Sequence, residues 1–321
     1  MRFVVYGAGA IGGLIGALLA EAGEDVLLIA RGAHAEAIRR SGLAVESPEG
    51  RRLVPLAVAE GPAASFHPGD VVLLAVKSQD TAAALSALRQ TAPPSISVVC
   101  VQNGVDNERA ALRLFADVYG VCVMCPAAHL EPGVVQAFSS PTPGLLDVGR
   151  YPVGVDALCS ALAAAFRAAT FESVARPDIM RWKYRKLLMN LGNAVEALCD
   201  GPGRLELAHL AGDEGVACLR AAGIDAASEE EDAARRGDLL QLHAVGGHRR
   251  AGGSSWQSLQ RGAGSIESDY LNGEIVLLGR RHGIPTPVNA LLQELAWERT
   301  LSGAGPGSLS TAAFFERLSE G

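Results

Sequence analysis

A glycine pattern near the N-terminus constrains the fold of this chain more than any other feature. An apolar, β-prone run at residues 2–6 is followed at once by glycines in the spacing G-x-G-x-x-G, by a helix-forming stretch and by a second apolar run at residues 26–29. Gly7 permits a tight turn, Gly9 lets the backbone approach a pyrophosphate, and Gly12 lets the helix pack close to the sheet. The order of strand, turn, helix and strand predicts a Rossmann-type dinucleotide-binding domain. Its expected cofactor contacts are Gly7, Ala8, Gly9, Ala10, Ile11 and Gly12.

The same stretch also has features of a secretory signal or a membrane span. Residues 3–20 carry no charge and follow Arg2, as in a signal peptide. Its several glycines would weaken an apolar helix, and no cluster of basic residues or second apolar span accompanies it. We therefore expect a cytoplasmic protein without a membrane segment.

The residue after the second apolar run indicates which dinucleotide is bound. An NAD site usually has Asp or Glu about 20 residues beyond the glycine motif, whereas this chain has Ala30 and Arg31 there. A guanidinium suits the 2′-phosphate of NADP, because it donates two parallel hydrogen bonds to a phosphate. His34, Arg39 and Arg40 either add positive potential or form a solvated helix face.

Composition bounds the remaining possibilities. A chain of 321 residues with a net charge of −7 and no basic stripe predicts about two globular domains and no nucleic-acid partner. The six cysteines are scattered, and the C-x-x-C at residues 122–125 has no second pair, so we expect buried thiols and no metal site. Of the 28 basic residues only Lys77, Lys183 and Lys186 are lysines. Because Lys can exchange protons when its environment perturbs it and Arg cannot, all three are candidate functional residues.

Two further apolar runs end in polar residues. The runs at 71–76 and 96–101 predict buried parallel strands, which Lys77 and Asn103 follow closely. Ligands bind at the carboxyl ends of such strands, so both side chains are expected near the cofactor; a surface lysine and an ordinary Asn-Gly turn are the alternatives. Residues 119–150 predict an antiparallel extension of the sheet, in which we expect Ala127 to contact the cofactor as well.

From about residue 177 the pattern is helical nearly throughout. The expected fold is therefore α/β, with an N-terminal Rossmann-type doubly wound sheet at 1–176 and an all-α C-terminal domain at 177–321. One long helix over 178–199 would place Lys186, Asn190 and Asn193 on one polar stripe, with Lys183 beside them. Such a stripe faces a cavity, or it consists of buried amides bonded to neighbouring backbone.

The C-terminal part offers two further candidates. Ser254 and Ser255 occupy an expected helix start, where hydroxyl and amide groups either hold a substrate carboxylate or simply cap the helix. A helix from about Ser265 to His282 carries Glu267 and stops at Gly283.

Taken in order, these pieces resemble the ketopantoate reductases over nearly the whole chain. The matching segments are residues 7–12, 76–77 with Thr81, 102–104, 131–133, 186–190, 254–255, 267–273 and 282–287. The resemblance implies NADPH-dependent reduction of the 2-keto acid 2-dehydropantoate (ketopantoate) to (R)-pantoate, on the route to pantothenate and coenzyme A.

The resemblance also implies roles for individual residues. Lys186 would be the general acid; Asn103, Asn190 and Ser255 would hold the substrate; Lys77, Asn103 and Glu267 would contact the cofactor or organise the site. A positioned ammonium suits the reaction because hydride arrival creates an alkoxide that needs a proton.

Two departures from the family pattern affect the substrate site. The family usually has a second Asn eight residues after the catalytic Lys, where this chain has Ala194 preceded by Asn193, and residues 202–204 replace a loop that commonly contains Asn-Gly. We expect Asn193 to substitute for the displaced amide. Alternatives are a reductase of another 2-keto acid, a dinucleotide sensor without turnover, and a His-based mechanism using His129. The oligomeric state stays open, with a homodimer as one candidate.

Overall fold

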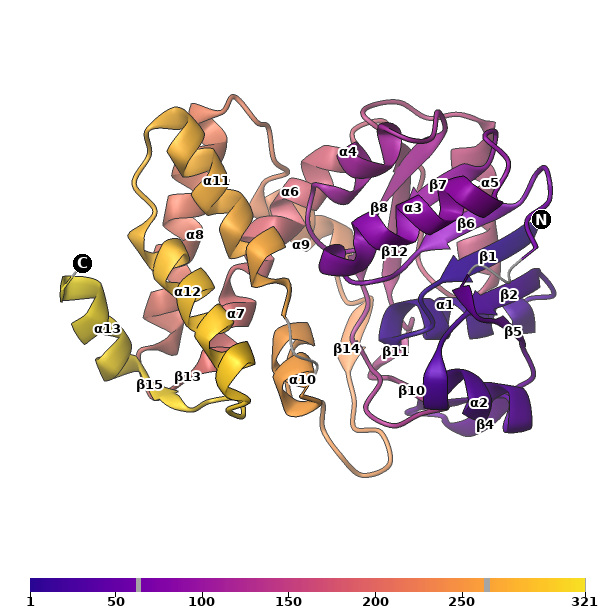
Figure 1. Cartoon of the computed structure of the whole chain (residues 1–321), viewed down its shortest axis with the longest axis horizontal. Helices are drawn as coiled ribbons and strands as arrows, with labels where there is room; N and C mark the ends of the chain where they lie inside the picture. The colour runs from indigo at the N-terminus through magenta and orange to yellow at the C-terminus, as the bar shows by residue number, and fades with distance from the viewer. Residues whose placement is uncertain (62–64, 263–265, 321) are drawn as a thin grey trace. The chain divides into compact units, whose positions relative to one another are not determined.

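The computed structural model describes residues 1–61, 65–262 and 266–320 of the chain. The chain divides into two compact units, of which unit 1 comprises Met1–Lys183 and Glu229–Arg250, and unit 2 comprises Tyr184–Ser228 and Ala251–Gly321. Figure 1 labels the elements of both units in chain order.

Unit 1 is built on a seven-stranded sheet with the order β12-β8-β7-β6-β1-β2-β5. Its strands are β1 (Arg2–Tyr6), β2 (Asp25–Ile29), β5 (Ala57–Ala59), β6 (Val71–Leu74), β7 (Ser97–Cys100), β8 (Val118–Met124) and β12 (Leu145–Arg150). All neighbours pair in parallel except β12, which is antiparallel to β8 as the sequence predicted. The strand order reverses at β1, between β2 and β6, which is the place where doubly wound sheets bind their ligands.

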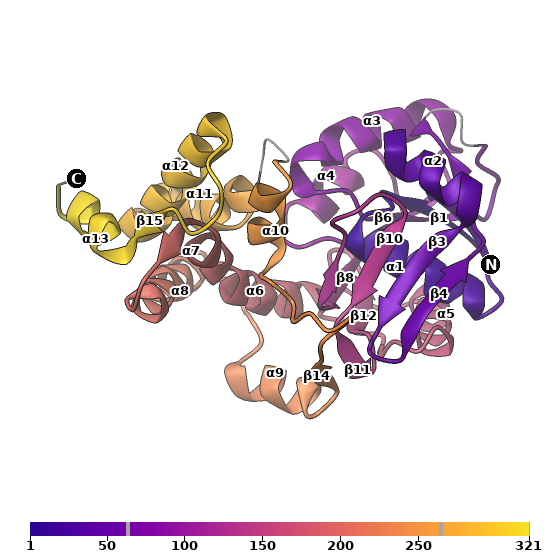
Figure 2. The ribbon, with the colours of Figure 1, turned by 90° about the horizontal axis from the view of Figure 1, so that it is seen from below.

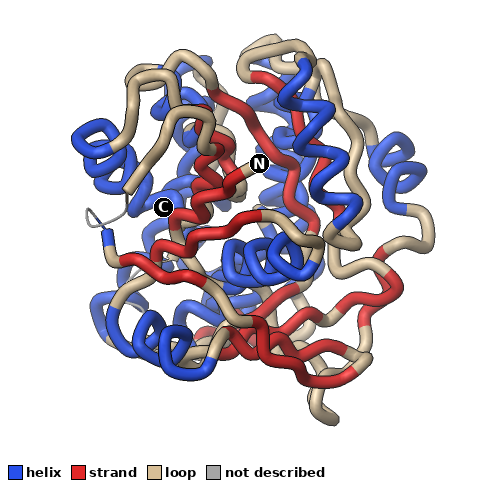
Figure 3. The backbone as a smooth tube through the Cα atoms, turned by 90° about the vertical axis from the view of Figure 1, so that its right-hand side faces the viewer, coloured by secondary structure: helices blue, strands red, loops and turns tan. Residues whose placement is uncertain are grey.

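Apolar side chains of the strands alternate between two cores, one on each face of the sheet. In β6, Val71 and Leu73 belong to the first core, and Val72 and Leu74 belong to the second. The first core includes residues of α1 (Ala10–Glu21), α2 (Gly32–Ser41) and α5 (Ala157–Ala168), and the second includes residues of α3 (Thr81–Thr91) and α4 (Asn107–Leu112). Figure 3 shows helices on both sides of the strands. Burial on both faces explains why these strands are continuous apolar runs.

A smaller four-stranded sheet packs beside helix α1, visible from below in Figure 2. Its order is β4-β3-β10-β9, formed by β3 (Leu43–Ser47), β4 (Gly50–Val54), β9 (Ala127–Ala128) and β10 (Val134–Ala137). Strands β3 and β4 form an antiparallel hairpin that turns between Ser47 and Gly50. The contacts of β9 with α1 bring Ala127 next to the helix that follows the glycine turn.

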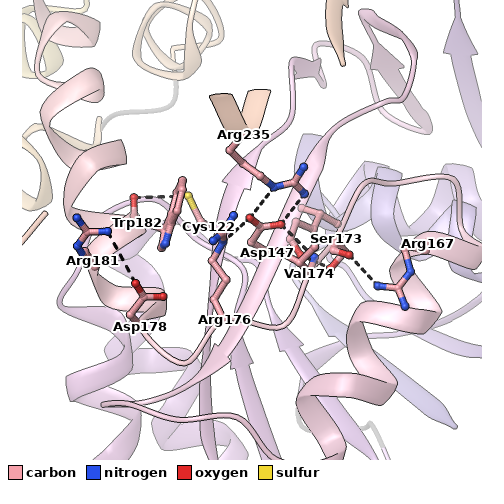
Figure 4. Close-up of polar contacts among 11 residues, drawn as sticks. Cys122, Asp147, Arg167, Ser173, Val174, Arg176, Asp178, Arg181, Trp182 and Arg235 are labelled. Atoms are coloured by element: carbon pink, nitrogen blue, oxygen red, sulfur yellow. Dashed lines mark hydrogen bonds and ion pairs between the residues drawn. The ribbon is translucent and has the colours of Figure 1, made fainter. Parts of the chain in front are cut away.

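The segment 229–250 is distant in sequence from the rest of unit 1 and belongs to it. It contains α9 (Glu229–Arg236) and β14 (Leu240–Leu242), which pairs with β11 (Ser139–Pro141). Arg235 of α9 donates two hydrogen bonds to the buried carboxylate of Asp147 on β12, at 2.7 and 2.9 Å. Arg176 binds the same carboxylate at 2.7 Å, as Figure 4 shows. Asp147 thus joins α9 to the edge of the sheet.

Unit 2 is mainly helical. Its helices are α7 (Gly192–Leu198), α8 (Arg204–Ala221), α10 (Ser254–Gln260), α11 (Asn272–His282), α12 (Pro287–Ser302) and α13 (Thr311–Glu320). Two short strands that the sequence did not suggest, β13 (Cys199–Asp200) and β15 (Leu309–Ser310), pair in parallel. Helix α6 (Ile179–Asn190) crosses the boundary, since Lys183 belongs to unit 1 and Tyr184 to unit 2.

Two of the expected helices are interrupted. The single helix expected over 178–199 is two helices, α6 and α7, separated at Leu191. The helix expected from Ser265 to His282 consists of a 3₁₀ turn, η3 (Glu267–Tyr270), and α11, and Ser265 itself lies outside the described residues. Its predicted end is confirmed, because Gly283 caps α11 in the left-handed conformation with a φ of 69°.

Candidate active site

The glycine turn after β1 has the geometry that its sequence predicted. Gly7 has a φ of 106°, and a Cβ on it would lie 2.8 Å from the backbone nitrogen of Val76. A Cβ on Gly12 would overlap the Gly7 carbonyl oxygen and lie 2.8 Å from the Cβ of Ala75, so α1 can approach the turn and the end of β6 only at a glycine. A Cβ on Gly9 would meet no described heavy atom within 4 Å. The open space at Gly9 and the amides of the first turn of α1 therefore fit a pyrophosphate.

Arg31 lies just beyond the carboxyl end of β2, as the N-cap residue of α2. Its guanidinium is exposed and acts on Tyr6 at the end of β1: burial raises the pKa of that phenol and the charge of Arg31 opposes the rise. No acidic residue occurs between Asp25 and Glu36. The position thus presents a positive charge where an NAD site would present a carboxylate.

His34 does not supply positive potential, which was one of the two roles predicted for it. The Gly133 amide donates to His34 Nδ1 at 2.8 Å, so Nδ1 carries no proton, and Nε2 donates to the carbonyl of Ala8 at 2.7 Å. Burial lowers the pKa of His34, which the bond to Ala8 partly offsets. The neutral ring therefore holds the glycine turn in place. The other two residues expected to add positive potential differ from each other: Arg39 forms an ion pair with Glu60 at 2.8 Å, whereas Arg40 is exposed.

The ring of His129, the alternative acid, lies against that of His34 at an interplanar angle of 50°. Their ring centroids are 4.2 Å apart, and His129 Nδ1 donates to the carbonyl of Val134 at 2.9 Å. One of its two ring nitrogens is therefore engaged within the smaller sheet.

Buried side chains join the turns that follow β6 and β7. The Gln102 amide nitrogen donates to the carbonyl of Val76 at 2.7 Å and to the hydroxyl of Thr81 at 2.8 Å. Asn107 accepts from the Thr81 hydroxyl at 2.8 Å and donates to the carbonyl of Asn103 at 2.9 Å. These bonds hold the turn with Asn103 beside the turn with Lys77, at the predicted carboxyl edge of the sheet.

Lys183 is engaged in unit 1 and is not part of an open polar stripe. Its ammonium lies 2.6 Å from a Glu108 carboxylate oxygen and 2.8 Å from the carbonyl of Gln102. Of the three lysines singled out by their scarcity, this one is the most completely buried, with 3% of its surface exposed.

Helix α6 carries Lys186 and Asn190 one turn apart, as the sequence predicted. Lys186 is half-buried and Asn190 is 4% exposed. The amide nitrogen of Asn190 has no hydrogen-bond partner among the described residues. A buried donor without a partner costs about 1–3 kcal/mol, so this amide fits a site where a ligand supplies the acceptor.

The break after α6 results from a distant side chain. The Leu191 carbonyl accepts from the amide nitrogen of Asn272 at 3.2 Å, and the same nitrogen donates to Asn289 at 2.9 Å. Asn289 in turn is bonded to Glu214 at 2.7 Å. This buried network supplies a partner for the helix-end carbonyl. Asn193 thus lies on α7, beyond this interruption, whereas Lys186 and Asn190 lie on α6; their common polar stripe stays a prediction.

Asn193 lies instead beside the start of α10. The Gly253 amide donates to the carboxylate of Glu196 on α7 at 2.9 Å, and a Cβ on Gly253 would lie 3.5 Å from the Asn193 side-chain oxygen. Gly253 is the N-cap, so the serines occupy the first turn of α10 and neither forms the predicted cap. Ser255 is buried, with 2% of its surface exposed. The structure thus brings Asn193 and the helix start that carries Ser255 together within unit 2.

The remaining site candidates are distributed over both units. Lys77 is half-buried and is the N-cap residue of the 3₁₀ turn η2 (Ser78–Asp80). Ala127 is buried in β9, and Glu267 begins η3 with 6% of its surface exposed.

Several other readings were tested by the structure. Residues 3–20 form β1, the glycine turn and most of α1, and no helix within the described ranges is long and apolar enough to cross a membrane. The cysteines are free, and all but Cys125 are buried. Among the described residues no group of three or more His, Cys, Asp or Glu side chains could hold a metal ion.

Three residues of these networks escaped the sequence analysis. Asn107 and Glu108 lie three and four residues after the Gln-Asn-Gly turn, and their proximity to it was the only available signal. Asn272 lies in the matching segment 267–273, but nothing in the sequence indicated its partner Leu191, which is 81 residues away in the chain.

Comparison with protein families and relatives gives a consistent result. The family model described as "Ketopantoate reductase PanE/ApbA" matches residues 3–152, and the one described as "Ketopantoate reductase PanE/ApbA C terminal" matches residues 178–299. A 2-dehydropantoate 2-reductase of Pyrococcus horikoshii is 30% identical over 95% of this chain and 99% of its own length. The protein of that name from Halobacterium salinarum is 32% identical over 92% and 97%.

Solved structures agree in fold. A PanE/ApbA family ketopantoate reductase from Ralstonia eutropha matches with a TM-score of 0.79 and 30% identity, covering 94% of this chain and 99% of that one. A D-mandelate dehydrogenase solved with NADH and anilino(oxo)acetate matches with a TM-score of 0.80 at 22% identity over the same shares of both chains. At that identity the second likeness concerns the fold alone.

Proposed function

Because the chain belongs to the ketopantoate reductase family, we propose that it reduces 2-dehydropantoate to (R)-pantoate with NADPH. The observation that carries this proposal is the match of both family models, which together span the sheet unit and most of the helices that follow. We further propose that residues 1–176 supply most of the cofactor contacts, and residues 177–321 the catalytic lysine and most of the substrate contacts. A cytoplasmic location and a homodimer stay predictions.

The residues of unit 1 fit a nicotinamide dinucleotide. The open space at Gly9 and the amides of α1 suit the pyrophosphate, and Arg31 suits a 2′-phosphate. We assign cofactor contacts to the six residues of the glycine turn and to Arg31, Lys77, Asn103, Ala127 and Glu267. When bound, NADPH supplies the hydride that the keto carbon accepts.

The protein's own part in the chemistry is assigned to polar residues of α6 and its neighbours. Reduction of a keto group leaves an alkoxide, and we assign to the Lys186 ammonium the roles of polarising the carbonyl oxygen and then donating its proton. The unpartnered amide of Asn190 would donate to the substrate. Asn103, Asn193 and Ser255 complete the proposed substrate contacts.

A second candidate function is reduction of a different 2-keto acid. It is favoured by the departures at Ala194 and at residues 202–204, where the family usually has amide-containing segments. The structure puts Asn193 beside α10, where its amide could grip a substrate of different shape.

The testing experiment measures NADPH oxidation with 2-dehydropantoate beside a panel of other 2-keto acids, and repeats each with NADH. Highest kcat/KM for 2-dehydropantoate with NADPH supports the main proposal. A higher value for another keto acid supports the second candidate. Binding of NADPH without turnover of any of them indicates a dinucleotide sensor.

A further inference from the structure

We propose that Lys183 is a positioning residue: through its buried pair with Glu108 it fixes the Gln102–Asn103 turn and thereby the direction of the Asn103 side chain. The inference rests on the proposed function only in its assumption that Asn103 contacts substrate and cofactor. Lys183 itself touches neither in this assignment.

The ammonium of Lys183 forms one buried ion pair and donates hydrogen bonds to two backbone carbonyls. Its partners are a carboxylate oxygen of Glu108 at 2.6 Å, the Gln102 carbonyl at 2.8 Å and the Val121 carbonyl at 3.3 Å. The side chains of Lys183 and Glu108 are 2% and 0% exposed. A buried ion pair of this kind is weak evidence for stability, because desolvation offsets the attraction. The contacts of the pair with a backbone turn point instead to a positioning role.

The geometry indicates that Lys183 holds the carbonyl of Gln102 in place. That carbonyl belongs to the peptide bond that leads into Asn103, so Lys183 binds the backbone directly before the functional side chain. Asn107 binds the carbonyl after it at 2.9 Å. The peptide groups on both sides of Asn103 are thus fixed by buried side chains. The Asn103 side chain itself makes no hydrogen bond to another described residue.

The space around the pair is shaped for these two side chains. A Cβ on Gly120 of β8 would lie 3.2 Å from Glu108 Oε1 and 3.3 Å from Lys183 Cδ. Both distances are tighter than ordinary contacts, so the glycine in β8 makes room for the pair. Burial raises the pKa of Glu108, and the adjacent ammonium opposes that rise.

The same contacts argue against Lys183 as the proton donor. Its ammonium is paired with a buried carboxylate and donates to two backbone carbonyls, so releasing a proton to substrate would break a buried ion pair. Lys186, three residues further along α6, is the lysine that the proposed function uses, whereas Lys183 organises the neighbouring turn.

The test is a double-mutant cycle between the buried pair and Asn103. The variant Lys183→Met/Glu108→Met removes both charges at similar volume, a change that often leaves stability intact. It is compared with Asn103→Ala and with the triple variant. We expect the paired substitution to lower kcat/KM about tenfold in the native background and less than about twofold in the Asn103→Ala background, because coupled residues are not additive.

A matched control is Arg235→Met, which disturbs the other buried charge cluster of unit 1 and leaves Asp147 paired with Arg176. It should change kcat/KM by the same small factor in both backgrounds. If the methionine pair does not fold, Lys183→Gln/Glu108→Gln replaces it, since two amides can keep one hydrogen bond. The inference would be overturned if the paired substitution lowered kcat/KM equally in the native and Asn103→Ala backgrounds, or did not lower it in either.

The same cycle separates this inference from the proposed function. If the native protein reduces no 2-keto acid, the proposed function fails, and the coupling is read from the dissociation constant of NADPH by fluorescence. Coupling in that constant would still support the role of Lys183, and its absence would overturn it. Failure of the native protein to bind any dinucleotide would overturn both.

Discussion

The buried amide of Asn107, at the carboxyl edge of the unit 1 sheet, and that of Asn190, on α6 in unit 2, are satisfied in different ways. In unit 1, Asn107 donates to and accepts from its neighbours. In unit 2, the equally buried Asn190 has an amide nitrogen without a partner among the described residues. An unsatisfied buried donor is costly. The difference suggests that Asn107 holds the two turns together, whereas Asn190 is placed to hold a ligand.

The largest effect is expected from the lysine next to the unpartnered amide. Lys186→Ala should lower kcat about 10³-fold, as loss of a general acid does, and leave the dissociation constant of NADPH nearly unchanged. Steady-state kinetics and fluorescence titration measure the two. Lys186→Arg serves as the control that keeps a charge without an exchangeable proton, and it should be nearly as inactive. Full activity of Lys186→Ala would shift the role to Lys183 or His129.

The contrast between Asn107 and Asn190 is tested by replacing each of them with Leu. Asn190→Leu should raise KM for the keto acid about 50-fold, because a hydrogen bond to a charged ligand is worth about 1.5–3 kcal/mol. It should not lower the free energy of unfolding, since no protein bond of its amide nitrogen is lost. Asn107→Leu should destabilise by about 3 kcal/mol, because buried partners lose their bonds. Urea unfolding followed by circular dichroism measures both, and equal destabilisation would remove the distinction.

The preference for NADPH over NADH tests the role assigned to Arg31 in unit 1. Arg31→Ala should weaken NADPH binding about 20-fold, the effect of losing a charge-assisted, bidentate contact, while NADH binding stays constant. Arg40→Ala, an exposed arginine of the same helix, should change neither. A native protein that prefers NADH would contradict the assignment of Arg31.

The smallest effect is expected from pH. Because the pKa of His34 is lowered in the folded protein, the unfolded chain binds its proton more readily. The contribution of His34 to stability is therefore complete above about pH 6.5 and is lost as the pH falls below that value. His34→Gln should reduce the difference in melting temperature between pH 7.5 and 5.5 by about 1–2 °C. His209→Gln, an exposed histidine, is the control, and an identical shift in both variants would contradict the role of His34.

Sequence reasoning succeeded where a feature depends on neighbouring residues. The glycine turn, the buried strands of the sheet, the antiparallel β12 and the stop of α11 at Gly283 were all predicted, and the structure confirms them. Each follows from local chemistry, such as a positive φ or an apolar run. The scarcity of lysine also pointed to Lys183, although its partners could not be named.

Sequence reasoning failed where distant residues decide. The helix expected to continue to residue 199 breaks at Leu191, whose carbonyl binds Asn272. His34 was open to a charged reading until its contacts with Ala8 and Gly133 showed a neutral ring.

The sequence by itself thus determined the family, the order of strands and helices in unit 1 and the residue types available for chemistry, because these depend on local pattern and composition. Only the tertiary structure decided that segment 229–250 joins unit 1, that Lys183 serves the Gln102 carbonyl, and that Asn190 keeps an unpartnered amide. The physical reason is that the partner of a buried polar group can come from any part of the chain, and packing chooses which one.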